Sequence, residues 1–331
     1  MGQLAQVLRE VQPPTDERVL LGPQDLDDAG VVLLGEREGC APGSRVALVQ
    51  TTDFFPPVVD DPWWYGAIAA ANSLSDVYAM GGRPLSALSL ASFPKGFEPE
   101  LIARILQGGC DKLRESGAVL AGGHTVEGNL TYGLAVTGTI DPDQVSAHKG
   151  AQVGDAVYLT KSIGMGCITT AAKFGHVSWE DVLPAAEQMG ALNAAAAEAM
   201  NAVGAHACTD VTGFGLVGHG ANIARASGLT LRLETSAIPV FPLSPGLAQA
   251  GHFSGGVKRG KQALGGSVSV AADVPQWLED LCFDAETSGG LLIAVPEERA
   301  SALEGELRAR ALPVDRIGSF VADSGKVVEL V

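Results

Sequence analysis

The chain has 331 residues, of which 46% are hydrophobic and 18% charged; this composition excludes global disorder and suffices for one large or two ordinary domains. Its 22 basic and 38 acidic residues give a formal net charge of −16, which repels nucleic-acid phosphates and anionic lipids. We therefore expect neither a nucleic-acid partner nor a membrane partner, whereas clustered carboxylates that bind Mg²⁺ fit this charge.

Apolar periodicity and Gly/Pro punctuation divide the first half of the chain into alternating strands and helices. In chain order we predict a helix over residues 4–11, strands over 31–34 and 45–55, a helix over 63–80, a strand over 85–93, a helix over 98–116, a strand from 118 that runs into a glycine turn at 122–124, and a strand over 130–140. The helix over 63–80 is built mainly from small residues and is closed by Gly81 and Gly82.

The pattern begins again after residue 150. We predict a strand over 156–161, a long helix over 184–203, a strand and loop over 207–215, a helix over 216–226 and a strand over 229–234, and we interpret 235–275 as surface loops. The joint lies near 141–155, so we expect two α/β lobes, with domains over 1–150 and 151–331. Ligands are expected where loops from the strand ends converge.

The positions of the aspartates are the most informative feature of the sequence. Asp27 and Asp28 precede the strand over 31–34, Asp53 ends the run VALVQTT, Asp76 lies on the small-residue helix, and Asp210 ends a short apolar run. An aspartate in apolar surroundings is costly without a partner, and no Lys or Arg is adjacent to these five. Each alone fits a helix cap or a turn, but the set favours Mg²⁺ that bridges carboxylates to polyphosphate oxygens.

Three glycine turns, at 122–124, 212–215 and 287–292, are the second feature. Backbone N–H groups at such turns can cradle phosphate, although Gly-Gly pairs are also common in ordinary turns. His124 and His219 fit either a phosphate ligand or proton donor or a structural histidine, and Lys161 could reach phosphate. The sequence has no GxxxxGK[ST] motif and no GxGxxG in a strand–helix setting, which disfavours P-loop and dinucleotide-binding folds.

The five cysteines are scattered and include no CxxC pair, a pattern typical of neither a disulfide framework nor a zinc site. No stretch approaches the roughly 18 apolar residues of a membrane span, and residues 1–14 lack the pattern of a signal peptide. We therefore expect a reducing, cytoplasmic location.

Six motifs together resemble the selenophosphate synthetase (selenide, water dikinase) family, and the resemblance covers essentially the whole chain. They are DDAGV (27–31), TTDFF (51–55), NSLSDVYAMGG (72–82), AGGHT (121–125), TDVTGFGLVGH (209–219) and DAETSGGLL (284–292). The resemblance implies the two-lobed α/β (α+β) fold of the aminoimidazole ribonucleotide synthetase-like superfamily, with N-terminal lobes that pair in a homodimer. It also implies ATP-dependent conversion of selenide and water to selenophosphate, AMP and phosphate.

The resemblance further implies roles for particular residues. By motif match, those that bind Mg²⁺ would be Asp28, Asp76 and Asp210. Those that contact ATP or its metals would be Asp25, Leu26, Asp27 and Asp53, and those that contact ATP bound mainly to the partner subunit would be Gly122, Gly123 and His124. The carboxylates would hold several Mg²⁺ ions along the triphosphate, which neutralises charge that develops during phosphoryl transfer.

One departure concerns the family's glycine-rich N-terminal segment, which carries a Cys or selenocysteine and, three residues later, a Lys. This chain begins at MGQLAQVL, which matches the helix after that segment, and no residue can be assigned either role. Whether the start is assigned after a selenocysteine codon or the chain is shortened, we expect a protein that folds, dimerises and binds Mg·ATP but forms little selenophosphate. Two alternatives stay open: a superfamily relative that phosphorylates another acceptor, such as a ribonucleotide amide or a thiamine phosphate, and a catalytically silent ATP-binding dimer.

Overall fold

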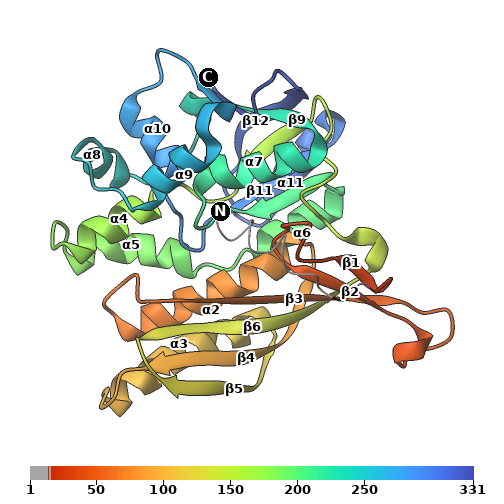
Figure 1. Ribbon diagram of the computed structural model, residues 1–331, viewed down its shortest axis with the longest axis vertical. Helices are drawn as coiled ribbons and strands as arrows, with labels where there is room; N and C mark the ends of the chain where they lie inside the picture. The colour runs from red at the N-terminus through yellow and green to blue at the C-terminus, as the bar shows by residue number, and fades with distance from the viewer. Residues whose placement is uncertain (1–13, 15) are drawn as a thin grey trace.

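The computed structural model describes residue 14 and residues 16–331, which form two lobes, each built around a β-sheet (Figure 1). The helix predicted over residues 4–11 lies outside the described residues. The predicted two-lobed α/β plan is confirmed. The domain boundary at residues 150 and 151 stays a prediction; it falls in the connection between the two sheets, which runs from Ile140 to Ala156.

The N-terminal sheet has the strand order β1-β2-β3-β6-β4-β5, and every neighbouring pair is antiparallel except β4 and β5. Its strands are β1 (Val19–Leu21), β2 (Gly30–Leu34), β3 (Val46–Phe55), β4 (Arg83–Phe93), β5 (Val119–Glu127) and β6 (Thr131–Ile140). Side chains alternate between faces along a strand, so Thr51 and Asp53 of β3 face the helices of this lobe. Gln50, Thr52 and Phe54 therefore lie on the opposite, open face.

Two helices, α2 (Pro62–Ala79) and α3 (Pro99–Ser116), cover the other face of this sheet (Figure 1). The side chain of Asp61 caps α2 by accepting a hydrogen bond from the backbone N–H of Trp64. Small residues let the two helices approach closely, because a Cβ atom at Gly66 would lie only 1.8 Å from the carbonyl oxygen of Ile105. Helix α2 is buried almost along its whole length, since it lies between the N-terminal sheet and the C-terminal lobe.

The C-terminal sheet has the strand order β10-β13-β9-β12-β7-β11-β8. Its strands are β7 (Ala156–Leu159), β8 (Ala207–Asp210), β9 (Leu229–Leu233), β10 (Val268–Val270), β11 (Leu291–Val295), β12 (Asp315–Ala322) and β13 (Val328–Leu330). Its helices are α4 (Met165–Lys173), α5 (Trp179–Gly190), α6 (Ala194–Val203), α7 (Gly215–Ser227), α8 (Ser244–Gln249), α9 (Gly256–Leu264), α10 (Gln276–Phe283) and α11 (Ala300–Ala309).

The lobes share a continuous apolar core. It runs from the N-terminal sheet through α2 into α5, α6 and α11 of the C-terminal lobe, while a second core fills the space beneath α7 and α10 on the other side of the C-terminal sheet. None of the helices in the described part of the chain is long and apolar enough to cross a membrane.

Three sequence expectations about secondary structure are wrong. The predicted glycine turn at 122–124 is part of the regular strand β5, and glycine is needed there for close packing, because a Cβ atom at Gly123 would lie 2.3 Å from the carbonyl oxygen of Ser89 on β4. The segment 235–275 is not only loops, since it contains α8, α9 and β10.

The third error is the long helix over 184–203, which is in fact two helices. Helix α5 ends at Gly190 and α6 begins at Ala194. The helix is interrupted there because Asn193 points inward. Its side-chain amide donates hydrogen bonds to the Ser75 hydroxyl and to the carbonyl oxygen of Gly289, both at 2.9 Å.

Candidate active site

Strand β3 and helix α2 bring two of the predicted aspartates together. Asp53 on β3 faces Asn72 on α2, and the Asn72 amide donates a hydrogen bond of 2.6 Å to Asp53 Oδ2. One helical turn further along α2, Asp76 accepts a hydrogen bond from the Thr51 hydroxyl on β3. Thr51 and Asp53 lie two residues apart on one face of the strand, and Asn72 and Asp76 lie four residues apart on one face of the helix. The two carboxylates therefore lie in one row between β3 and α2.

The other acids reach this row from the loop before β2 and from the end of β8. Asp28 Oδ1 lies 3.2 Å from Nε2 of His148 and accepts a hydrogen bond of 2.8 Å from the Thr209 hydroxyl. Asp27 Oδ2 accepts a hydrogen bond of 2.9 Å from the backbone N–H of His148. Atoms of Asp28, Asp210 and His219 lie within 4.8 Å of one another, close enough to share an ion. We call Asp27, Asp28, Asp53, Asp76 and Asp210 the acid cluster.

The acid cluster is electrostatically unfavourable without a cation. Burial, reinforced by the neighbouring carboxylates, raises the pKa of Asp210 to about 8 and that of Asp76 well above its ordinary value. Burial also raises the pKa of Asp53 to about 6. Within the described chain, the buried oxygens Asp28 Oδ2 and Asp210 Oδ2 have no hydrogen-bond partner. Buried carboxylate oxygens without a partner are the donor set that a hard divalent cation requires.

A buried network connects this cluster to the loop that precedes β11. The Lys161 ammonium donates hydrogen bonds to the carbonyl oxygens of Ala191, at 2.8 Å, and Ser288, at 2.9 Å. The Ser288 N–H in turn donates to Asn72 Oδ1, at 2.9 Å, and Asn72 holds Asp53. Ser288 adopts a positive φ of 48°, a strained conformation that persists only where the surroundings impose it. Lys161 thus binds two backbone carbonyl oxygens, and a contact between its ammonium and a phosphate stays a prediction.

The same loop also fixes the start of α4. Both side-chain oxygens of Glu286 accept backbone hydrogen bonds there, from Gly164 at 2.6 Å and Met165 at 2.9 Å. Burial nevertheless raises the pKa of Glu286 to about 8. The motif DAETSGGLL therefore joins β11, α4 and the N-terminal helix α2 in one rigid arrangement.

Two histidines behave differently at this site. His148 contacts Asp28 directly, and the carboxylates of Asp28 and Asp27 raise the pKa of His148 despite its burial. His219 contacts Thr209 and Thr212, and burial lowers its pKa to about 4, so it is neutral near pH 7. A neutral imidazole is suited to a structural or ligand role, which disfavours His219 as a proton donor.

The remaining predicted residues lie in two other places. Asp25 and Leu26 line a pocket of about 700 Å³ beside the acid cluster. Gly122, Gly123 and His124 lie on the exposed edge strand β5, three strands from β3 in the sheet and therefore about 14 Å away. Within one chain, the structure does not bring these three residues to the acids.

Sequence reasoning missed the residues that hold the acids in place. Thr51, Asn72, Thr209 and His148 were not singled out, although the first three lie inside the quoted motifs. The alternation along β3 and the spacing of four between Asn72 and Asp76 could have indicated that their side chains meet. His148 lies in the joint between the lobes, and nothing in its local sequence indicates its contact with Asp28.

Comparison with known protein families matches both lobes. The family model for the N-terminal domain of AIR synthase related proteins matches residues 26–140, and the model for the C-terminal domain of these proteins matches residues 152–331.

Curated relatives are similar over nearly the whole chain. A selenide, water dikinase of Caldanaerobacter subterraneus subsp. tengcongensis is 43% identical over 327 residues, which is 98% of this chain and 90% of that protein. A selenide, water dikinase of Porphyromonas gingivalis is 40% identical over 333 residues, which is 100% of this chain and 93% of that protein.

Solved structures share the fold at lower identity. Thiamine-monophosphate kinase from Stenotrophomonas maltophilia superposes with a TM-score of 0.69 at 19% identity, covering 99% of this chain and 94% of the other. The hydrogenase maturation protein HypE in complex with ATP superposes with a TM-score of 0.62 at 22% identity, covering 84% of this chain and 77% of the other.

Proposed function

The chain belongs to the selenide, water dikinase family, and from this premise we propose that it converts ATP, selenide and water to selenophosphate, AMP and phosphate. The observation that carries this proposal is the acid cluster. The aspartates of four quoted motifs, far apart in the sequence, meet at the junction of the two lobes, where a polyphosphate and its metal ions need them.

We propose Mg²⁺ as the cation of the acid cluster, held by Asp28, Asp76 and Asp210. Its fit is supported by the carboxylate donors and by the two buried oxygens that have no partner in the described chain, Asp28 Oδ2 and Asp210 Oδ2. His219 lies close enough to Asp28 and Asp210 to share the ion. When bound, Mg²⁺ supplies positive charge that offsets the charge of the phosphate oxygens.

The protein's own contribution is to hold the carboxylates in fixed directions. Asn72 and Thr51 orient Asp53 and Asp76, while Thr209 and His148 orient Asp28. These partners are buried or partly buried, so the carboxylates cannot reorient freely when a nucleotide arrives. Preorganised groups of this kind lower the cost of stabilising charge during phosphoryl transfer.

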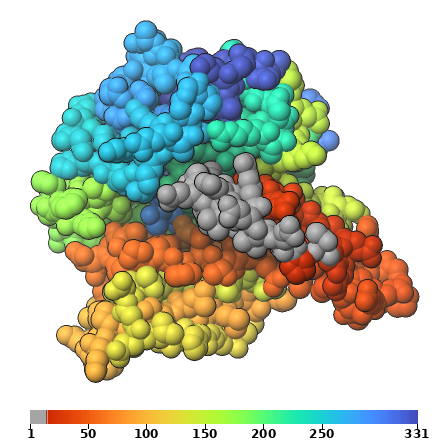
Figure 2. Space-filling view, viewed as in Figure 1, coloured from red at the N-terminus to blue at the C-terminus, as the bar shows by residue number. Residues whose placement is uncertain are grey.

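We propose that the active unit is a homodimer whose subunits pair through the open face of the N-terminal sheet. This face carries exposed apolar side chains, among them Phe54 with 56% and Leu88 with 47% of its surface accessible. Strand β5 is exposed along its whole length and offers an unprotected edge. Figure 2 shows that β3 to β6, coloured orange to yellow, form the surface of the molecule away from the C-terminal lobe.

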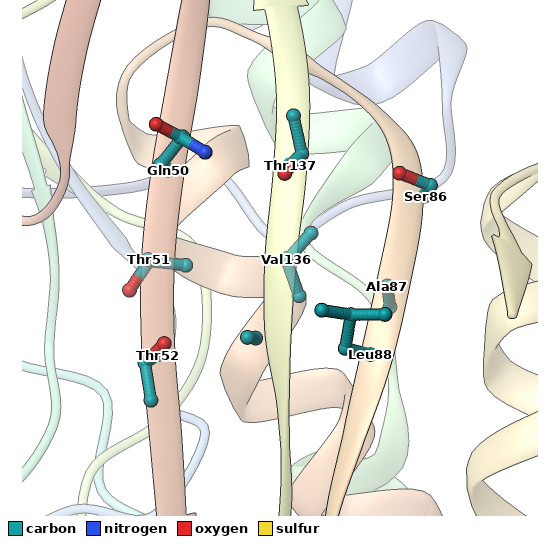
Figure 3. Close-up of a pocket in the computed structure, with 9 residues that line it drawn as sticks. Gln50, Thr51, Thr52, Ser86, Ala87, Leu88, Val136 and Thr137 are labelled. Atoms are coloured by element: carbon teal, nitrogen blue, oxygen red, sulfur yellow. The ribbon is translucent and has the colours of Figure 1, made fainter. Parts of the chain in front are cut away.

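A shallow hollow of about 370 Å³ on the N-terminal sheet supports this pairing. Figure 3 shows residues of β3, β6 and β4 side by side across it, with Thr137 between Gln50 and Ser86, as the strand register requires. Such a hollow can receive side chains of a second copy. Pairing would also bring Gly122, Gly123 and His124 of one subunit toward ATP bound to the other, with Asp25, Leu26, Asp27 and Asp53 supplied by the subunit that holds the nucleotide.

We further propose a cytoplasmic location. All five cysteines are free, and three of them, Cys167, Cys208 and Cys282, are buried. Free thiols are typical of a reducing compartment.

Product analysis tests the proposed reaction. The protein is incubated anaerobically with ATP, Mg²⁺ and selenide, and ³¹P NMR is used to follow the products. We expect AMP, phosphate and a phosphorus signal split by a bonded selenium. The amount of this product also tests the sequence-based expectation of a low selenophosphate yield. Formation of ADP alone would contradict the proposed reaction and favour a relative that phosphorylates another acceptor.

A further inference from the structure

A pocket lies beside the acid cluster, and two arginines are among the residues that line it. It lies between the loop that carries Asp25 and Leu26, helix α7 and helix α9, and it has a volume of about 700 Å³. Its wall includes His148, which contacts Asp28 at 3.2 Å, so the pocket and the acid cluster share a side chain. A ligand bound here is therefore adjacent to the acid cluster.

Two arginines line this pocket against a single carboxylate, that of Asp25. Arg225 of α7 and Arg259 of α9 both line it, and neither forms an ion pair with any residue in the described ranges 14 and 16–331. Other arginines, such as Arg232 and Arg316, are paired with carboxylates. In a chain with a net charge of −16, two unpaired guanidinium groups facing one pocket constitute a local attraction for anions.

From this arrangement we infer that the pocket is the acceptor-side subsite, where Arg225 and Arg259 bind the hydrogen selenide anion before it meets the phosphate held at the acid cluster. The inference rests on the proposed function. It supplies what that function leaves open, namely how an anionic acceptor reaches five carboxylates.

The chemistry of the pocket suits this anion. At neutral pH selenide is present mainly as the monoanion HSe⁻, which is large, polarisable and weakly hydrated. The guanidinium group is the more weakly hydrated of the two cationic side chains and therefore binds such an anion at a smaller desolvation cost than an ammonium group. The remaining wall is largely apolar, with Phe214, Leu26 and Leu264 beside the two arginines, and Phe214 is 45% exposed. Apolar walls favour a soft anion over strongly hydrated phosphate.

The pocket also has a defined access side. Phe214 lies in the turn directly before α7, and its ring lies 5.4 Å from the His219 ring, which is buried behind it. Leu26 has a positive φ of 54°, so the Asp25–Asp28 loop makes a sharp turn that leaves the Leu26 side chain exposed beside the pocket while Asp27 and Asp28 turn inward. The turn at Leu26 thus places Leu26 on the solvent-facing wall of the pocket and the carboxylates of Asp27 and Asp28 on its inner side.

Kinetics of the arginine variants test this assignment. We compare wild type with Arg225→Ala, Arg259→Ala and the double variant, and we use Arg232→Ala, a surface arginine of β9 paired with Glu329, as the matched control. Each single change is expected to raise KM for selenide by roughly tenfold, as the loss of a charge-assisted contact does, while KM for ATP stays unchanged. In wild type, KM for selenide rises with ionic strength, and the double variant loses this dependence. An unchanged KM for selenide, or an equal rise in KM for ATP, would overturn the inference.

A second measurement does not depend on turnover. The ⁷⁷Se NMR signal of selenide is recorded anaerobically, without ATP, as the protein is added. Wild type and Arg232→Ala should broaden the signal, and the double variant should not. If turnover is normal but broadening is equal in all variants, the subsite is wrong and the proposed function stands. If wild type forms no selenophosphate but still broadens the signal through these arginines, the reaction is wrong and the subsite stands.

Discussion

The acid cluster and the edge strand β5 carry the two sets of predicted ATP contacts, and they differ in burial and in hydrogen bonding. The acids are buried or half-buried, and residues of the same chain hold them through hydrogen bonds of 2.6 to 3.2 Å. Gly122, Gly123 and His124 lie on a strand that is exposed at every position, about 14 Å from Asp53. One region is therefore preorganised by its own fold, whereas the other can contribute to a site only in the homodimer that we propose.

The largest effect is expected from a change in the buried region. Asp210→Asn removes a charge from the acid cluster with little change in packing, and it should lower ATP turnover by roughly 1,000-fold. The folded state should remain intact, because the substitution removes a charge that burial first, and neighbouring carboxylates second, disfavour by raising the pKa of Asp210. The matched control is Asp143→Asn, an exposed partner of Arg45. Wild-type turnover at limiting Mg²⁺ would show that Asp210 is not a ligand.

The open face of the N-terminal sheet, to which β5 belongs, should be sensitive to an added charge. Phe54→Asp places a carboxylate on the open face of the N-terminal sheet, where Phe54 has 56% of its surface accessible and makes no contribution to the buried core. We expect monomers in analytical ultracentrifugation and a loss of activity of roughly 100-fold, because the partner's contacts are displaced. A monomeric variant with full activity would contradict the shared site, and a dimer that persists would place the interface elsewhere.

The rigidity of the buried region is expected to depend on Lys161. Lys161→Met leaves the carbonyl oxygens of Ala191 and Ser288 without their donor and should lower the free energy of unfolding by about 1–3 kcal/mol. Since Ser288 holds Asn72 and Asn72 holds Asp53, kcat should fall more than KM for ATP rises. Denaturant unfolding together with steady-state kinetics measures both. A variant that is destabilised but keeps its kcat would separate Lys161 from the positioning of Asp53.

A further effect is a pH dependence of stability that arises in the buried loop before β11. Burial raises the pKa of Glu286 from its ordinary value of 4.5 to about 8, so the native state binds more protons than the unfolded state between these two values. The contribution of Glu286 is fully present below pH 4.5 and is lost as pH rises through 8. The difference in unfolding free energy between wild type and Glu286→Gln should therefore fall by at most about 1.4 kcal/mol per pH unit in this window. A difference independent of pH would show that Glu286 stays ionised throughout.

Long, regular elements could be predicted from the sequence because their patterns are strong. The helix over 63–80 has a cap, a proline start and a glycine stop, and α2 covers Pro62–Ala79; the strands over 85–93 and 130–140 are likewise confirmed as β4 and β6. Errors arose where small residues hide the period. Glycine in β5 reads as a turn, although it serves the close approach of β4, and the run of alanines around Asn193 hides the break between α5 and α6.

The aspartates of the acid cluster could be predicted because unpaired acids in apolar runs are conspicuous. The side chains that position them could not, since Thr51, Asn72 and Thr209 are ordinary residues of a strand or helix until a partner faces them. Arg225 and Arg259 lie 34 residues apart on two helices, one of them in the segment interpreted as loops, so their shared pocket depends on the tertiary fold.

The most direct test of a site shared between subunits is complementation in mixed dimers. Asp210→Asn removes one carboxylate of the acid cluster in one chain, and His124→Ala removes the His124 side chain of β5 in another. Each variant alone should therefore be strongly impaired. After the two are mixed and allowed to exchange subunits, half of the dimers contain one chain of each kind. Each of these dimers has one site with intact acids and an intact partner His124. The account predicts recovery of about a quarter of wild-type selenophosphate formation. Activity equal to the average of the two separate variants would show that each chain works alone and would contradict the shared site.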